Sequence, residues 1–129
     1  MLKAVLILED EEKLRKTLQK QLSKMDSVGT VSDYSNADEL LRELESLSPT
    51  PNIGILDINM PGENNGIDAL VAIKKKYEDM NVYMFTSSDD PAEHERCRNL
   101  GATDVIVKPM GRIAIKVALS GIVNGINDD

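Results

Sequence analysis

The sequence predicts an α/β domain built on a doubly wound, five-stranded parallel sheet with helices on both faces. Two observations carry this prediction. Five short apolar runs alternate with five segments whose apolar residues recur at helical spacing. No repeat, low-complexity tract or long linker interrupts the alternation, so we expect one domain over residues 1–129.

The first run, AVLIL at 4–8, is apolar throughout, as expected of a central strand covered on both faces. A helix is predicted over 12–25, where apolar residues recur at spacings of four, four and three and basic residues take most other positions. The strand at 28–33 is more polar, so we place it at a sheet edge. Ser35 or Asn36 then caps a second helix. Its inward residues are Leu40, Leu41, Leu44 and Leu47.

The middle of the chain holds a strand, a loop and a helix. Pro49 and Pro51 prevent helical continuation, so the third strand is expected over 52–56, with Asp57 at its end. A loop over 59–66 leads into the third helix. The apolar side of that helix consists of Ile67, Leu70, Ile73 and Tyr77.

The fourth strand is expected over 81–85, and Asp89 or Asp90 caps the helix that follows. Gly101 is placed to end this helix. Its apolar stripe is thin and consists of Ala92, Cys97 and Leu100.

A strand over 104–107 and a helix over roughly 112–125 complete the chain. The helix has two apolar rows. A second row, Ile113 and Val117, either extends the core or forms a surface for an output partner or a second copy. The row expected in the core is Ile115, Leu119, Ile122 and Ile126.

Composition excludes several classes of function. The net charge of −7 argues against direct nucleic-acid binding, which depends on clustered Lys and Arg. No apolar run approaches the roughly 20 residues that span a bilayer, so we expect no membrane segment and a cytoplasmic location. Cys97 is the only cysteine, which excludes an intramolecular disulfide and a zinc cage. His94 is interpreted as a surface helix residue.

Polar residues end four of the predicted strands. Glu9 and Asp10 follow the first strand, and Asp57, Thr86 and Lys108 follow the third, fourth and fifth. In doubly wound sheets ligands bind at the carboxyl ends of the strands, so these side chains should converge. Close carboxylates repel one another unless positive charge compensates them, and Mg²⁺ and Lys108 are the candidates. Such a site suits phosphoryl transfer to the Asp57 carboxylate.

Four motifs, ILED (7–10), LDINMPG (56–62), FTS (85–87) and GATDVIVKP (101–109), resemble those of bacterial response-regulator receiver domains of the chemotaxis type. The resemblance covers essentially the whole chain and implies the flavodoxin-like strand order 2-1-3-4-5. It also implies a two-component switch rather than a turnover enzyme. A sensor histidine kinase or histidine phosphotransfer protein would phosphorylate it, and the protein, a monomer or weak homodimer, would then bind a downstream output partner. We expect no output domain within residues 1–129, so the chain is either a stand-alone receiver or part of a larger regulator.

By position, the resemblance makes Asp57 the phospho-acceptor, Thr86 the switch hydroxyl and Lys108 the lysine that contacts the phosphoryl group. Pro109 stands where the family commonly has a cis proline. Asn59 and Ser88, two residues beyond the acceptor and the switch hydroxyl, are implied to tune dephosphorylation. The implied Mg²⁺ ligands are Asp10, Asp57, the Asn59 backbone carbonyl and, through water, Glu9.

The sequence departs from the family pattern at three places. Glu9 stands where aspartate is commoner, which predicts an altered metal affinity. The loop over 62–66 is one residue longer than usual, which affects the geometry beside the acceptor. Val105 replaces an aromatic residue that changes rotamer as the hydroxyl moves, so we expect the signal to reach the surface by another route.

Three alternatives remain open. A pseudo-receiver would keep the fold and signal without phosphate. A Mg²⁺-dependent phosphohydrolase with an aspartyl-phosphate intermediate would share the nucleophile, but it would need a second acid where Asn59 stands. The basic side of the helix at 12–25 is either a solvated face or a docking surface for the kinase.

Overall fold

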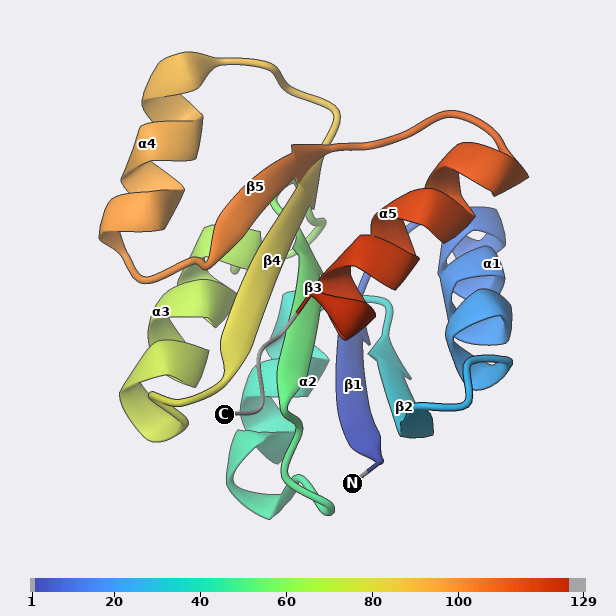
Figure 1. The fold of residues 1–129 in the computed structure, drawn as a ribbon. Helices are drawn as coiled ribbons and strands as arrows, with labels where there is room; N and C mark the ends of the chain where they lie inside the picture. The colour runs from blue at the N-terminus through green and yellow to red at the C-terminus, as the bar shows by residue number, and fades with distance from the viewer. Residues whose placement is uncertain (1, 126–129) are drawn as a thin grey trace.

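A five-stranded parallel sheet forms the centre of the molecule, with strand order β2-β1-β3-β4-β5 (Figure 1). The computed structural model describes residues 2–125. Each neighbouring pair of strands runs parallel. The fold class and strand order expected from the sequence are therefore confirmed. The strands are β1 (Lys3–Leu8), β2 (Val28–Tyr34), β3 (Ile53–Asp57), β4 (Asn81–Thr86) and β5 (Asp104–Val107).

Helices cover both faces of the sheet: α1 and α5 lie on one face, and α2, α3 and α4 lie on the other (Figure 1). The predicted helix at 12–25 is shorter than expected and ends at Ser23. The second helix ends at Glu43 and continues as a short 3₁₀ turn. The helices are α1 (Glu12–Ser23), α2 (Ala37–Glu43), α3 (Gly66–Lys76), α4 (Pro91–Asn99) and α5 (Arg112–Asn124).

Two apolar layers enclose the sheet because successive side chains of a strand point to opposite faces. In β1, Val5 and Ile7 pack against α1 and α5, while Leu6 and Leu8 pack against the helices of the other face. All four side chains are essentially inaccessible to solvent. The uninterrupted apolar run of β1 is thus explained by burial on both sides. β2, by contrast, lies at an edge and carries exposed polar residues, as its sequence predicts.

Side-chain caps fix where the helices begin. Asn36 caps α2 by accepting a hydrogen bond from the Glu39 amide at 2.8 Å, and Asp90 caps α4 by accepting one from Ala92 at 3.0 Å. The sequence left Ser35 and Asp89 open as alternatives for these positions. Asn65, which was not predicted, caps α3.

The two apolar rows of α5 differ in exposure. Ile115, Leu119 and Ile122 are buried, whereas Ile113 and Val117 are 82% and 68% exposed. The second row therefore does not extend the core, and Ile126 lies outside the described residues. Among residues 2–125, the helices are all too short or too polar to cross a membrane.

Candidate functional site

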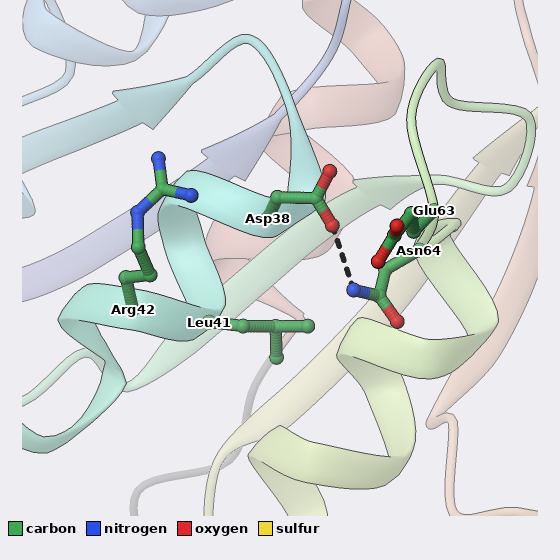
Figure 2. A pocket seen from close by; sticks show the side chains of 5 residues that line it. All are labelled: Asp38, Leu41, Arg42, Glu63 and Asn64. Carbon is green, nitrogen blue, oxygen red and sulfur yellow. Dashed lines mark hydrogen bonds between the residues drawn. The ribbon is translucent and has the colours of Figure 1, made fainter.

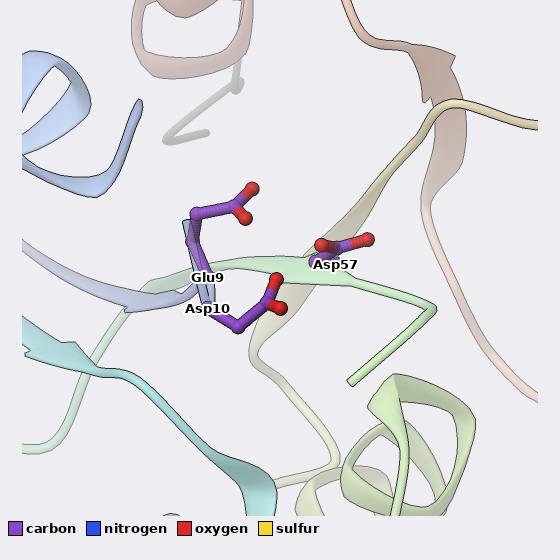
Figure 3. A group of neighbouring side chains, drawn as sticks. All are labelled: Glu9, Asp10 and Asp57. Atoms are coloured by element: carbon purple, nitrogen blue, oxygen red, sulfur yellow. The ribbon is translucent and has the colours of Figure 1, made fainter. Parts of the chain in front are cut away.

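The carboxyl ends of four strands meet at one edge of the sheet and bring the predicted polar residues together. Glu9 and Asp10 follow β1, and Asp57 is the last residue of β3. Carboxylate oxygens of these three acids lie within 4.8 Å of one another (Figure 3). Glu9 and Asp57 are buried, whereas Asp10 is exposed. Three oxygen ligands at this spacing could hold a hard divalent cation.

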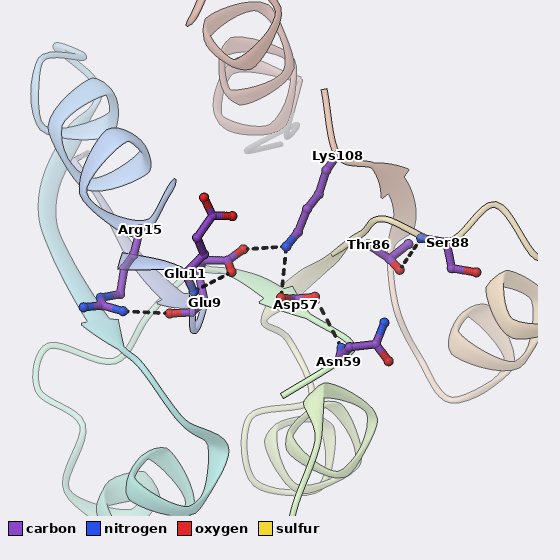
Figure 4. Close-up of polar contacts among 8 residues, drawn as sticks. All are labelled: Glu9, Glu11, Arg15, Asp57, Asn59, Thr86, Ser88 and Lys108. Carbon is purple, nitrogen blue, oxygen red and sulfur yellow. Dashed lines mark hydrogen bonds and ion pairs between the residues drawn. The ribbon is translucent and has the colours of Figure 1, made fainter. Parts of the chain in front are cut away.

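Lys108 joins two of these acids (Figure 4). Its Nζ lies 3.0 Å from Asp57 Oδ2 and 3.0 Å from Glu9 Oε1. The Lys108 amide also donates to the Thr86 carbonyl at 2.7 Å, which fixes the backbone where β5 ends. The expectation of a cis proline at Pro109 is wrong for this structure, because the cis peptide bond of the described chain precedes Pro49.

Glu9 is the most enclosed acid of the site, with 1% of its surface exposed. Its Oε2 accepts a hydrogen bond from the Glu11 amide at 3.1 Å. Its buried Oε1 faces Lys108 as an ion pair but accepts no well-aligned hydrogen bond. Burial raises the pKa of Glu9 to about 7, because desolvation outweighs the stabilisation of the carboxylate by the Glu11 amide and Lys108. Glu9 therefore changes charge near neutral pH.

For Lys108 the same surroundings have the opposite balance, because its acidic neighbours outweigh burial. Burial by itself would lower its pKa, but the hydrogen bond to Asp57 and the ion pairs with Asp57 and Glu9 outweigh burial, so the pKa of Lys108 is raised. Lys108 is thus a fixed positive charge between two buried carboxyl groups.

Asp57 is 4% exposed, and both of its carboxylate oxygens have partners. Oδ2 contacts Lys108, and Oδ1 accepts a hydrogen bond from the Asn59 amide at 3.3 Å. Behind it, Gly66 packs so closely that a Cβ atom there would overlap the Asp57 carbonyl oxygen. The sequence marked Gly66 only as the end of a loop, because a close approach between distant residues leaves no local signal.

The long loop after β3 is attached to α2. The Asn64 amide donates to Asp38 Oδ1 at 2.6 Å (Figure 2). An open depression of about 430 Å³ lies beside this contact, lined by Asp38, Leu41, Arg42, Glu63 and Asn64. The loop is therefore tied to the neighbouring helix by this hydrogen bond.

Thr86 reaches the same edge but its hydroxyl is engaged elsewhere. The side chain is fully buried, and Oγ1 accepts a hydrogen bond from the Ser88 amide at 3.0 Å (Figure 4). Val105 is buried in the core, so no aromatic ring occupies this position.

Arg15 is a further residue at the site that the sequence placed only on a basic helix side. Its Nη1 donates to the Glu9 carbonyl at 3.0 Å, and its Nε lies 3.6 Å from Asp33. His94, which was expected at the surface, is partly buried and forms a hydrogen bond with the Ser88 carbonyl. The only sequence signal for Arg15 is its position five residues after Asp10, near the start of the predicted helix.

Comparisons with known proteins give relatives at moderate identity. "Sensory transduction protein LytT" of Oceanobacillus iheyensis is 28% identical over 118 residues, which cover 92% of this chain and 47% of that protein. The protein-glutamate methylesterase/protein-glutamine glutaminase of Bacillus subtilis is 30% identical over 113 residues, 86% of this chain and 30% of the relative. The chain thus spans a half or less of these relatives.

Solved structures share the fold. The phosphorylated cyanobacterial phytochrome response regulator RcpA has a TM-score of 0.86 at 17% identity, covering 98% of both chains. The Mn²⁺-bound response regulator Rcp1 has a TM-score of 0.84 at 18% identity, covering 97% of both. The isolated receiver domain of RcsB from Salmonella enterica serovar Typhimurium, with phosphomimetic BeF₃⁻, has a TM-score of 0.80 at 21% identity, covering 97% of this chain and 91% of its own.

The family described as response regulator receiver domain matches residues 5–120, from the middle of β1 into α5. This span includes every residue of the acidic site. The chain belongs to the receiver domains of two-component response regulators.

Proposed function

We propose that the chain accepts a phosphoryl group on Asp57 and that phosphorylation changes its affinity for a downstream partner. The observation that carries the proposal is the setting of Asp57. Its carboxylate is 4% exposed, contacts Lys108 at 3.0 Å and lies beside two further acids at the end of β3. The donor would be the phosphohistidine of a sensor kinase or a histidine phosphotransfer protein.

The acidic site fits Mg²⁺. Its ligand atoms are hard oxygens within 4.8 Å of one another, and the buried Glu9 Oε1 accepts no well-aligned hydrogen bond. Asp10, Asp57 and the Asn59 carbonyl would hold the ion, with Glu9 acting through water. Bound Mg²⁺ would neutralise negative charge on the carboxylates and on the phosphoryl oxygens.

The chain's own residues account for the rest of the chemistry. A carboxylate oxygen of Asp57 attacks phosphorus, an O–P bond forms and the P–N bond of the donor breaks. Lys108 is already 3.0 Å from Asp57, so its charge is in place for the phosphoryl oxygens. The Thr86 hydroxyl must leave the Ser88 amide to donate to the same group.

Similar structures support the proposal. RcpA is a phosphorylated protein, RcsB carries a phosphomimetic and Rcp1 binds Mn²⁺. These states belong to those three proteins. Their fold is also the fold of this chain, which carries three acids of its own at the carboxyl edge of its sheet.

The partner surfaces are also proposals. The basic side of α1 borders the site through Arg15, and Met110 and Ile113, 92% and 82% exposed, lie just beyond Lys108. We propose that the kinase or phosphotransfer protein docks on the surface formed by the basic side of α1 together with Met110 and Ile113. The protein is proposed to act in the cytoplasm, because a lone, buried free cysteine suits a reducing compartment.

A pseudo-receiver remains the second candidate, favoured by Val105 in place of an aromatic residue. Phosphohydrolase activity has less support, because Asn59 cannot protonate a leaving group. The methylesterase relative does not favour an enzyme, since the chain covers 30% of it.

Incubation with Mg²⁺ and acetyl phosphate, followed by intact mass measurement, tests the proposal. We expect a gain of one phosphoryl group that hydroxylamine removes, as it does for an acyl phosphate. Asp57→Asn should abolish the gain, and Asp26→Asn, the same change at an exposed site, should not. An unchanged mass of the wild-type protein, or a full gain in Asp57→Asn, would refute it.

A further inference from the structure

The segment between β4 and α4 is held by a continuous set of hydrogen bonds centred on Ser88. We infer that His94 couples the Thr86 hydroxyl to α4 through the main chain of Ser88. This inference rests on the proposed function, in which Thr86 turns toward a phosphoryl group on Asp57. His94 is a positioning residue in this scheme, because it touches neither Asp57 nor Lys108.

The amide and the carbonyl of Ser88 both form hydrogen bonds. Its amide donates to Thr86 Oγ1 at 3.0 Å, and its carbonyl lies 2.8 Å from His94 Nε2. A carbonyl oxygen can only accept, so Nε2 carries the proton of the bond. The Ser88 hydroxyl also accepts from the Asp90 amide at 3.2 Å. One residue therefore connects the buried hydroxyl at the site to the first two turns of α4.

The position of α4 depends strongly on this connection because its own packing is weak. Cys97 is the one residue of α4 that is buried, whereas α3 buries five of its residues. The helix sequence PAEHERCRN is largely polar, so α4 buries little apolar surface against the sheet.

Movement of the Thr86 side chain changes the hydrogen bonding of the Ser88 backbone. Rotation of the hydroxyl toward Asp57 removes the acceptor of the Ser88 amide, and a partly buried amide without a partner is unfavourable. The Ser88 peptide then shifts, and this shift changes the hydrogen bond between the Ser88 carbonyl and His94. The route needs no aromatic residue at Val105. By linkage, any change of the His94 bond alters the preference of Thr86 by the same free energy.

The spectroscopic test uses the fact that His94 is the only histidine of the chain. A long-range ¹H–¹⁵N spectrum of the uniformly labelled protein therefore shows a single imidazole. We expect the Nε2–H tautomer in the free protein and a shift of both ring nitrogens after phosphorylation by acetyl phosphate and Mg²⁺. The shift should be largely lost in Thr86→Ala protein that carries the adduct.

The kinetic test removes the ring. His94→Ala should gain the phosphoryl group about 2- to 10-fold faster than wild type, the factor for loss of one neutral hydrogen bond that opposes the turn of Thr86. Glu95→Ala, at the exposed neighbouring position, is the matched control and should react at the wild-type rate. Urea unfolding confirms that both variants are folded.

The outcomes are distinguishable. A full adduct with unmoved ring signals, or a His94→Ala rate equal to wild type, would overturn the coupling and leave the proposed function intact. Absence of any adduct would overturn the proposed function and the coupling with it.

Discussion

Glu9 is predicted to destabilise the metal-free protein at alkaline pH. Its carboxyl group has a pKa of about 7 in the fold against an ordinary value of 4.5. The folded state therefore binds the proton more tightly than the unfolded state, and this contribution to stability is fully present below pH 4.5 and lost as the pH rises through about 7. Replacing Glu9 by Gln removes the ionisation.

The expected size follows from the shift. Each pKa unit corresponds to about 1.4 kcal/mol, so the ionised Glu9 lowers the free energy of unfolding by about 3 kcal/mol at high pH. The attraction of Lys108 is already included in the pKa of Glu9. Glu9→Gln should therefore be more stable than wild type by up to this amount above pH 8, and by little at pH 5.

Urea unfolding from pH 5 to 9 in the presence of a chelator measures this difference. Glu95→Gln, an exposed position on α4, is the control and should follow the wild-type pH profile. Excess Mg²⁺ should reduce or reverse the advantage of Glu9→Gln, because the ion favours the ionised carboxylate. A difference that stays constant with pH, or a wild-type protein that is the more stable one at pH 8.5, would refute the reasoning.

Three further predictions follow from the same geometry. Gly66→Ala should unfold the protein or lower its stability by several kcal/mol, because the new Cβ would overlap the Asp57 carbonyl oxygen; Gly121→Ala, with open space around it, should raise the melting temperature slightly. Lys108→Gln should lower the free energy of unfolding at pH 7 by about 1–3 kcal/mol and raise the pKa of Glu9 further, seen as a displaced pH profile. Mg²⁺ binding at pH 7 should release roughly half a proton, measured by calorimetry in buffers of different ionisation enthalpy, and none in Glu9→Gln.

Much of the fold was predictable because each element is encoded locally. Apolar runs and helical spacing identified five strands and five helices, and β5 has the predicted bounds of Asp104–Val107. The bounds of one helix were wrong, because α1 ends at Ser23 instead of residue 25. In the second helical segment, α2 ends at Glu43 and Leu44 lies in a 3₁₀ turn, although Leu44 and Leu47 were expected on the inward side of the helix. Helix ends are set by competition between local hydrogen bonds, which periodicity does not report.

The residues of the candidate site were also predictable. Parallel strands present their carboxyl ends at one edge, so a polar residue after an apolar run is placed there by topology alone. Glu9, Asp10, Asp57 and Thr86 lie where this rule puts them, and Lys108 bridges two of them. Their roles in phosphoryl transfer stay predictions.

What the sequence by itself determined was most of the core positions along the strands and helices and which edge of the sheet carries the polar groups, because both follow from periodicity and topology. Ala92, which is exposed, and His94, which is partly buried, are exceptions in α4. Only the tertiary structure decided how those groups interact: the burial that raises the pKa of Glu9, the contact of Gly66 with Asp57, and the bond from His94 to Ser88. These contacts join separate elements, and their distances depend on how the elements pack, which no local pattern of residues specifies.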